Sequence, residues 1–254
     1  MAGGHVHALY RHGASPLHRM APHVKTVAAL GFVFAVVATP REAVWAFGLY
    51  ALGLAALVVL AGLGPRFVAS RLVVELPFVL AALALPVLGG GETVDVLGVS
   101  LSRQGLWDMW NILAKATLGL GTSIVLAGTT PIPALLRGLG TLRFPRIVTA
   151  IAGFMMRYLD VVLSEFRQMR VAMQSRGYQP RWLGNLKPYA ASVGILFVRS
   201  YERGERVYLA MASRGYAGRM PAMAADAAGP AEWAAALAVP LAAWLVVALA
   251  WSVA

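Results

Sequence analysis

The chain has no cysteine among its 254 residues, which excludes disulfides, thiolate metal sites and cysteine nucleophiles. Charged residues make up only 13%, about half the share of a typical soluble domain. Acidic residues are the scarcest, with 11 Asp and Glu against 22 Lys and Arg. No paired carboxylates or histidines suggest acid–base chemistry on facing helices. The chain also lacks the G-x-x-x-x-G-K-[ST] phosphate cradle, so it should not hydrolyse ATP itself.

Hydrophobic residues, by contrast, make up 59% of the chain, and the mean hydropathy is +0.68. A basic soluble protein would suggest nucleic acid, but a basic and apolar one indicates a membrane protein with cationic cytoplasmic loops and no nucleic-acid partner. A membrane-spanning helix needs about 20 apolar residues. Five runs are candidates, at residues 24–38, 44–63, 67–88, 106–128 and 231–254. We therefore predict an all-α polytopic membrane protein with about five transmembrane helices.

Two of these runs are imperfect. The first is short, and the third is interrupted by Arg71, Glu75, Pro77 and Pro86. A cleaved signal peptide is a weaker explanation for the first run, because 23 residues precede it and a proline follows almost at once.

The distribution of cations predicts the orientation. With the N-terminus in the cytoplasm, the cytoplasmic segments 1–25, 64–71 and 129–230 hold 3, 2 and 14 Lys and Arg. The outer loops then hold only Arg41 and Arg103. Cytoplasmic loops carry such an excess, so we expect a cytoplasmic N-terminus.

Residues 129–229 are too charged to span and too long for a structureless loop. Apolar residues recur there at helical spacing, which predicts long amphipathic helices from about residue 145 to 173 and from 189 to 213, and a shorter one at 133–142. The predicted domains are thus 1–128, with the first four spans, a cytoplasmic coupling-helix region at 129–229, and a C-terminal span at 230–254.

The two long helices end in the same motif. Residues 172–178 (AMQSRGY) match residues 210–216 (AMASRGY) at six of seven positions, with an offset of 38 residues. Glycine at a helix C-cap supplies the left-handed backbone conformation, and arginine complements the helix dipole. Capping explains one copy but leaves the repetition unexplained, whereas a guanidinium at a helix tip is a natural clamp for a partner carboxylate. Two such tips suggest a twofold partner. The candidate docking residues are Ser175, Arg176, Gly177, Ser213, Arg214 and Gly215.

The fourth span carries two stripes. Gly119, Ser123 and Ala127 recur at steps of four, and small residues let another membrane helix approach closely. We favour packing within this chain as their role, and contact with another subunit is the alternative. On the outer part of the same span, Asp108 and Lys115 lie two turns apart, which predicts that they partly neutralise each other.

All five histidines lie in the first 23 residues. His5, His7 and His12 have a spacing that could hold a divalent metal, but we predict no metal site there, because the segment lies on the wrong side of the membrane to receive incoming metal.

Three segments carry a family resemblance: residues 15–25 (SPLHRMAPHVK), the two Ser-Arg-Gly motifs, and residues 201–211 (YERGERVYLAM). Together they resemble the transmembrane T component of energy-coupling factor (ECF) transporters, most of all the cobalt-type branch called CbiQ. Both motifs have Ser where the family has Ala. Residues 20–23 (MAPH) stand where the family often has Leu-Asp-Pro-Arg.

The resemblance implies a coupling subunit in the bacterial plasma (inner) membrane. Its partners would be a cytoplasmic ABC-type ATPase dimer and a small substrate-binding membrane subunit. The motif arginines would dock in grooves on the ATPases, which bind the ATP and Mg, so this chain would be no enzyme and would hold no cofactor. The implied cargo is cobalt, or sometimes nickel.

Two other functions stay open. One is an ion-coupled secondary transporter, which would need ionisable residues or broken helices near the membrane midplane. The other is an ECF coupling subunit that serves vitamin-binding subunits.

Overall fold

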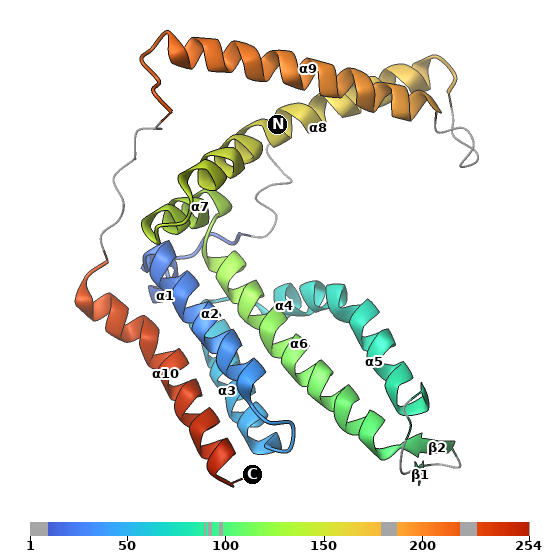
Figure 1. The fold of residues 1–254 in the computed structure, drawn as a ribbon, viewed down its shortest axis with the longest axis vertical. Coiled ribbons are helices and arrows are strands. Elements are labelled where there is room, and N and C mark those ends of the chain that lie inside the picture. The colour runs from blue at the N-terminus through green and yellow to red at the C-terminus, as the bar shows by residue number, and fades with distance from the viewer. Residues whose placement is uncertain are drawn as a thin grey trace. The chain divides into compact units, whose positions relative to one another are not determined.

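The computed structural model describes residues 10–88, 90, 93–96, 99–178, 187–218 and 228–253. Most of them are helical (Figure 1), which confirms the predicted all-α polytopic class. The elements are α1 (Pro16–Arg19), α2 (Pro22–Ala38), α3 (Val44–Leu60), α4 (Pro65–Leu72), the 3-10 helix η1 (Val73–Glu75), α5 (Leu76–Leu88), β1 (Thr93–Val96), β2 (Val99–Ser102), α6 (Arg103–Thr129), α7 (Ile132–Thr141), α8 (Arg146–Ser175), α9 (Lys187–Ala212) and α10 (Pro230–Val253).

The chain divides into two compact units. One contains α8 and α9. The other, called the bundle below, contains α1 to α7, the two strands and α10.

Four helical stretches among the described residues have the length and apolar composition to cross a membrane: Pro65–Val87, Arg103–Thr129, Arg146–Ser175 and Pro230–Ser252. The apolar helices α2 and α3 have 17 residues each, at the lower limit of about 17 for a span. All five predicted spans are thus apolar helices of the bundle. The remaining candidate is α8, which we expect not to cross because of its charged face; length and composition alone do not test that expectation.

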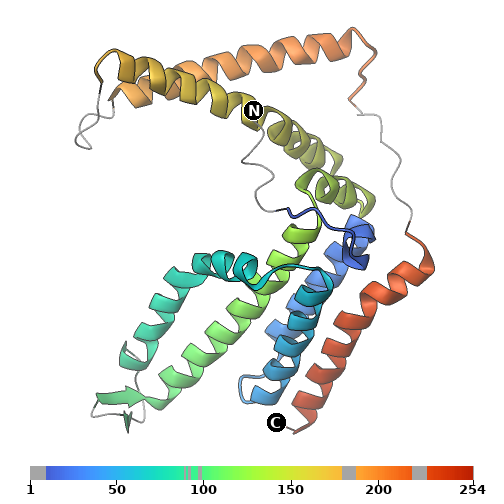
Figure 2. The same ribbon diagram turned by 180° about the vertical axis from the view of Figure 1, so that it is seen from behind.

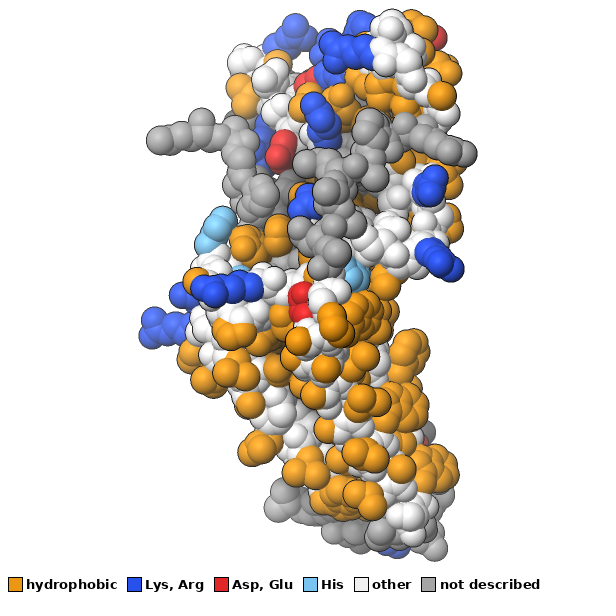
Figure 3. All heavy atoms as spheres, turned by 90° about the vertical axis from the view of Figure 1, so that its left-hand side faces the viewer, with side chains coloured by type: hydrophobic (Ala, Val, Ile, Leu, Met, Phe, Trp, Pro, Cys, Tyr) orange, Lys and Arg blue, Asp and Glu red, His pale blue; other side chains and the backbone are white. Residues whose placement is uncertain are grey.

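The centre of the bundle is α2, which packs against α10, α6 and α7. Figures 1 and 2 both show α2, α3 and α10 side by side. Glycine permits one of the close approaches, since a Cβ at Gly31 of α2 would lie 3.1 Å from Cβ of Pro240 in α10. The largest buried cluster consists of Phe32, Ala35, Val36, Ala43, Ala46, Phe47, Tyr50, Leu118, Ala243, Val247 and Ala250. One face of the molecule shows hydrophobic side chains covering the bundle surface (Figure 3), as a lipid environment requires.

The C-terminal end of α2 is held by polar groups from other helices. Lys115 Nζ donates to the carbonyl of Val37 at 2.9 Å, and Trp251 Nε1 donates to the carbonyl of Ala38 at 3.1 Å. The last carbonyls of a helix have no partner within the helix. Because they lie in an apolar bundle, these donors from α6 and α10 replace the missing bonds.

The expectation that Lys115 neutralises Asp108 is therefore wrong. Asp108 instead accepts from Arg41 Nη1 at 2.8 Å. Hydrogen bonds to the carboxylates of Glu42 and Asp108 raise the pKa of Arg41 above its usual value. Asp108 and Lys115, the two charged residues of the predicted stripe on α6, therefore each bind a group far away in the sequence.

The third predicted span is broken where the sequence predicts an interruption. The α-helical hydrogen bonding of α4 gives way to one 3-10 turn at Val73–Glu75 before α5 continues. Glu75 is 7% exposed and accepts from Thr117 Oγ1 of α6 at 2.8 Å. A buried carboxylate needs such a donor, so α6 supports the break.

A short antiparallel hairpin, β1 and β2, precedes α6, and Thr93 pairs with Ser102. The sequence analysis does not predict these strands. The hairpin leads directly into α6, where Ser102 Oγ accepts from the backbone N–H of Gly105 at 3.1 Å. This N-cap bond satisfies one of the free donors at the start of the helix.

Helices α8 and α9 confirm the two long helices predicted from apolar spacing. The 30 residues of α8 begin directly after Pro145, where proline is tolerated because the first amides need no helical partner. Helix α9 has 26 residues. The C-terminal half of α8 lies beside the N-terminal half of α9 in both views (Figures 1 and 2).

Candidate functional site

The first Ser-Arg-Gly motif ends α8 in a complete Schellman cap. Gly177 has φ +78°, the left-handed conformation that glycine adopts without strain. Its N–H donates to the carbonyl of Gln174 at 3.0 Å, and the N–H of Tyr178 donates to the carbonyl of Met173 at 3.0 Å. These are the two bonds that define the motif. Ser175 Oγ donates to the carbonyl of Ala172 at 2.9 Å.

The second motif ends α9 in the same way. Gly215 has φ +83°, and its N–H donates to the carbonyl of Ala212 at 3.0 Å. The N–H of Tyr216 donates to the carbonyl of Met211 at 3.0 Å. Ser213 Oγ donates to the carbonyl of Ala210 at 3.0 Å. The two helix tips therefore share their backbone conformation as well as their sequence.

This geometry corrects the reasoning about the repeat. The expectation that capping cannot explain the shared residues is wrong for most of them. Glycine supplies the positive φ, and the serine hydroxyl donates to a carbonyl in the last turn. Met and Tyr are joined by the hydrogen bond from the Tyr N–H to the Met carbonyl, and an apolar pair commonly occupies these two positions of a Schellman motif. The arginine side chain is the shared feature that the cap does not use.

Both arginine side chains are available. Arg176 and Arg214 are exposed, and neither guanidinium makes a hydrogen bond or ion pair with another residue that the structure describes. A fixed cap holds the backbone of each arginine, so its guanidinium projects from a defined point at the end of a long helix. A planar guanidinium in that position can bind a carboxylate with two parallel hydrogen bonds. The further matching residues Arg181 and Arg219 lie outside the described residues.

The two tips differ in their surroundings. At the end of α8, the ring of Tyr178 lies 5.8 Å from that of Tyr189 in α9, measured between centroids. Nearby, Ser192 Oγ lies 3.6 Å from Sδ of Met173. The equivalent residues of the second tip, Met211 and Tyr216, make no such side-chain contact among the described parts of the chain. The first tip is thus braced by α9, whereas the described residues give the second tip no hydrogen bond or ring contact of this kind.

An ion pair joins the two helices further along. Arg203 of α9 forms an ion pair with Glu165 of α8 through Nη2 and Oε1. These residues are separated by 38 positions, the same offset as the repeat. This pair is not among the predictions from the sequence, because contact between the two helices depends on how they pack and not on the spacing of the repeat.

The small-residue stripe of α6 lies on an open face. A Cβ at Gly119 would meet nothing within 4 Å, and Ser123 is exposed, with its Oγ donating to the carbonyl of Gly119 at 3.0 Å. Ala127 on the same stripe is half-buried. Close packing within the bundle uses a different face of α6, where a Cβ at Gly121 would lie 2.5 Å from Cδ2 of Leu54. Close packing within this chain therefore involves Gly121 and not Gly119.

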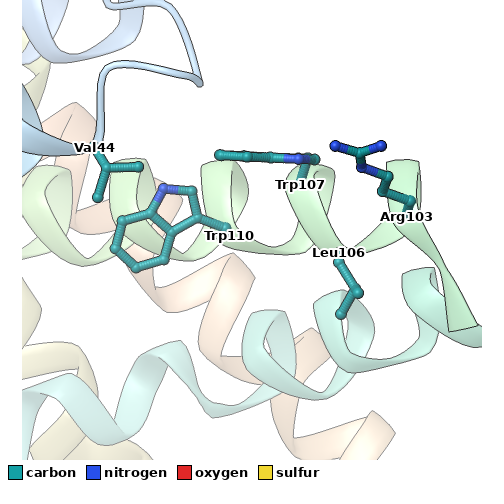
Figure 4. A pocket seen from close by; sticks show the side chains of 5 residues that line it. All are labelled: Val44, Arg103, Leu106, Trp107 and Trp110. Atoms are coloured by element: carbon teal, nitrogen blue, oxygen red, sulfur yellow. The ribbon is translucent and has the colours of Figure 1, made fainter. Parts of the chain in front are cut away.

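A shallow apolar pocket lies near the start of α6 (Figure 4). It is lined by Val44 of α3 and by Arg103, Leu106, Trp107 and Trp110 of α6. Tryptophans near the end of a spanning helix are typical of the aromatic belt at a membrane–water interface. The two tryptophans of this pocket therefore fit a position at such an interface.

Among the described residues, no three His, Cys, Asp or Glu side chains lie close enough together to hold a metal ion. His18 makes local contacts, with Ser15 Oγ at 2.7 Å from its Nδ1 and the carbonyl of Arg11 at 2.9 Å from its Nε2. His5 and His7 lie outside the described residues.

An apolar helical bundle joined in one chain to two long helices with exposed arginine tips defines a polytopic membrane protein that presents paired cationic ends. Comparison with known proteins identifies the family. A family model described as the CbiQ cobalt transport protein matches residues 13–223, and the chain belongs to this family, the cobalt-type branch of ECF T components. It is therefore a component of a membrane transport system.

Curated relatives include two proteins named as cobalt transport proteins. The chain is 28% identical over 215 residues to the putative fused cobalt transport protein CbiMQ of Methanocorpusculum labreanum, a match that covers 82% of this chain and 36% of that protein. It is 28% identical over 174 residues to the cobalt transport protein CbiQ of Rhodobacter capsulatus, covering 65% of this chain and 70% of the relative. An uncharacterized protein of Methanocaldococcus jannaschii, MJ1089, is 29% identical over 102 residues, covering 40% of this chain and 38% of that protein. The chain thus spans just over a third of the length of CbiMQ and of MJ1089.

Proposed function

We propose that this chain is the transmembrane coupling subunit of an ATP-driven ECF-type importer of cobalt or nickel. In this role it binds a cytoplasmic ATPase dimer through Arg176 and Arg214 and a separate substrate-binding subunit through the bundle. The N-terminus lies in the cytoplasm of a bacterial cell, and the bundle spans the plasma membrane. The observation that carries the proposal is the pair of identical helix caps whose arginine side chains take no part in capping.

The caps support docking because they hold the two cations in equivalent settings. A symmetric dimer presents two equivalent sites, and equivalent tips suit such a partner. An exposed arginine without a partner in its own chain contributes little to the stability of that chain. Its repetition at both tips is therefore best explained by a partner that it binds.

The energy for transport must come from that partner, because the sequence has no phosphate-binding loop. ATP and Mg are then bound by the ATPases, and α8 and α9 transmit their motion. A helix transmits displacement along its axis because its backbone hydrogen bonds resist bending. The separate subunit selects the cargo, and the family's description as a cobalt transport protein supports cobalt or nickel over a vitamin.

The open stripe of Gly119, Ser123 and Ala127 is the proposed contact for the substrate-binding subunit. Its small side chains allow a second membrane helix to approach closely. The rest of the bundle leaves this face uncovered at Gly119.

The test is co-purification of the ATPase in mild detergent. The wild-type chain should retain an ATPase dimer, each of Arg176→Ala and Arg214→Ala should retain less, and the double variant should retain none. Arg170→Ala and Arg206→Ala are matched controls, since both remove an exposed arginine from the same helices. Recovery of the ATPase by the double variant at the wild-type level would refute the docking role.

One observation favours a second function, an ion-coupled secondary transporter. Glu75 is a buried carboxylate at a break in a spanning helix, which is a common setting for coupling ions. In that case uptake would persist without any ATPase and would follow an imposed ion gradient. Uptake in vesicles that contain only this chain and the substrate-binding subunit decides between the two functions.

A further inference from the structure

The contacts between α8 and α9 are unevenly placed along α9. Three of them involve its first turns, where Tyr189 meets Tyr178 and Phe166 and Ser192 meets Met173. The ion pair between Arg203 and Glu165 lies eleven residues further along α9 than Ser192. Among the described residues, it is the last side-chain bond between the two helices before the second tip.

The ion pair therefore sets the length of the free end of α9. From Arg203 to Arg214 is eleven residues, or about 16 Å of helix at 1.5 Å per residue. Without the pair, the nearest described hydrogen bond or ring contact between the two helices is at Ser192, 22 residues or about 33 Å of helix before Arg214. A rotation of about 15° then moves the tip by about 9 Å instead of about 4 Å.

The pair is also well shielded from water. The side chain of Glu165 is 17% exposed and that of Arg203 is 27% exposed. Glu165 Oε2 and Arg203 Nη1 are buried and have no hydrogen-bond partner among the described residues, so neither charge has another partner to replace the one it would lose. Removing one member of a shielded pair is costly, whereas exchanging the two charges preserves the attraction.

The position of the pair in the repeat gives the two tips equal reach. Glu165 lies eleven residues before Arg176, and Arg203 lies eleven residues before Arg214. Measured from the ion pair, both helices extend by the same length to their motif arginines. A pair one turn earlier or later on either helix would not have this property.

We propose that the Glu165–Arg203 ion pair positions the second tip, Ser213 to Gly215, relative to the first by fixing α9 against α8. Glu165 and Arg203 are positioning residues, and their importance for transport rests on the proposed docking function. The separation of the two tips does not depend on docking and can be measured on this chain alone.

Spin labels at the two tips measure that separation. The natural chain has no cysteine, so Gln174→Cys and Ala212→Cys provide two unique labels. These positions are exposed, and they are equivalent in the repeat, at its one mismatched residue. Pulsed electron–electron resonance on the full chain in lipid nanodiscs then gives the distribution of distances between them.

With the pair intact, we expect one narrow distribution. Glu165→Gln should broaden it and shift its mean by several ångströms, and the exchange of Glu165→Arg with Arg203→Glu should restore it. Glu205→Gln is the matched control, since it removes an exposed carboxylate from α9 and should change nothing. If Glu165→Gln folds poorly, Arg203→Met, which keeps the aliphatic stem, should broaden the distribution in its place.

A distribution unchanged by both Glu165→Gln and Arg203→Met would overturn the proposal, and so would broadening that the charge exchange does not reverse. Failure of the docking function gives a different result. In that case the tip distances respond as expected here, while the Arg176→Ala and Arg214→Ala double variant still retains the ATPase.

Discussion

The caps make a quantitative prediction about Gly215. Its φ of +83° lies in the left-handed region, and a Cβ there would meet nothing within 4 Å. The cost of Gly215→Ala therefore comes from the backbone alone, without a steric clash. For a residue with a side chain, that conformation costs about 1–2 kcal/mol.

Alanine at position 215 can relieve this conformational strain only by opening the cap. Opening breaks the hydrogen bond from the N–H of Tyr216 to the carbonyl of Met211. If docking requires the closed cap, the ATPase should bind Gly215→Ala about 5- to 30-fold more weakly, at about 1.4 kcal/mol per factor of ten. Asparagine tolerates the left-handed conformation better than alanine, so Gly215→Asn should lose less. Titration of the detergent-solubilised chain with the purified ATPase measures these affinities.

Gly204 provides a control of opposite sign within the same helix. It lies in the interior of α9, has no positive φ, and a Cβ there would also meet nothing within 4 Å. Gly204→Ala should therefore stabilise α9 by about 0.5–1 kcal/mol and leave docking intact. Wild-type affinity of Gly215→Ala, together with wild-type hydrogen-exchange protection at the amide of Tyr216, would contradict the predicted strain in the cap.

Three further changes test the bundle. Gly119→Leu should leave the fold intact and reduce co-purification of the substrate-binding subunit. Gly48→Leu, at an equally open position of α3, should leave that co-purification unchanged. Equal losses from both variants would contradict the proposed contact. Glu75→Gln keeps a hydrogen-bond acceptor, so ATP-driven uptake should continue at a similar rate, and a loss of gradient-driven uptake would instead support the secondary transporter. Gly105→Ala would place a Cβ 2.5 Å from the carbonyl oxygen of Leu85, a backbone atom that cannot move aside cheaply. We expect it to destabilise the bundle by about 1–3 kcal/mol, seen as a lower Tm in detergent, and an unchanged Tm would show that α5 and α6 can separate freely.

Local patterns were sufficient to predict the helices. A run of apolar residues or an apolar row at helical spacing predicts the same element wherever it lies in the fold. The second cytoplasmic helix, expected at residues 189–213, is observed at Lys187–Ala212. The break in the third span follows from the same local reasoning, because Arg71 and Glu75 interrupt its apolar run.

The caps are also local features that the sequence can predict, and the predicted C-cap glycines are confirmed by the positive φ of Gly177 and Gly215. Met at the start of the cap bond, Gly at the left-handed position and Tyr after it form a local pattern within six residues. A helix end is closed by its own neighbours, so this pattern needs no tertiary information. The pattern leaves the arginine as the shared charged side chain that makes no cap hydrogen bond.

The partners of the polar groups could not be predicted in this way. Asp108 meets Arg41 across 67 positions, and Lys115 reaches the carbonyl of Val37 across 78. The spacing of Asp108 and Lys115 suggested a pair within one helix, but the packing of α6 against the end of α2 offered each of them a better partner.

The sequence by itself determined which segments are apolar helices and that two of them end alike, because both properties depend on neighbouring residues. The tertiary structure decided which faces are covered and which remain open, and so distinguished Gly121, packed on Leu54, from Gly119, which faces open space. It also decided that Glu165 and Arg203 meet. Only the packing of one helix on another fixes distances between residues far apart in the chain, and those distances determine where the two arginine tips can reach.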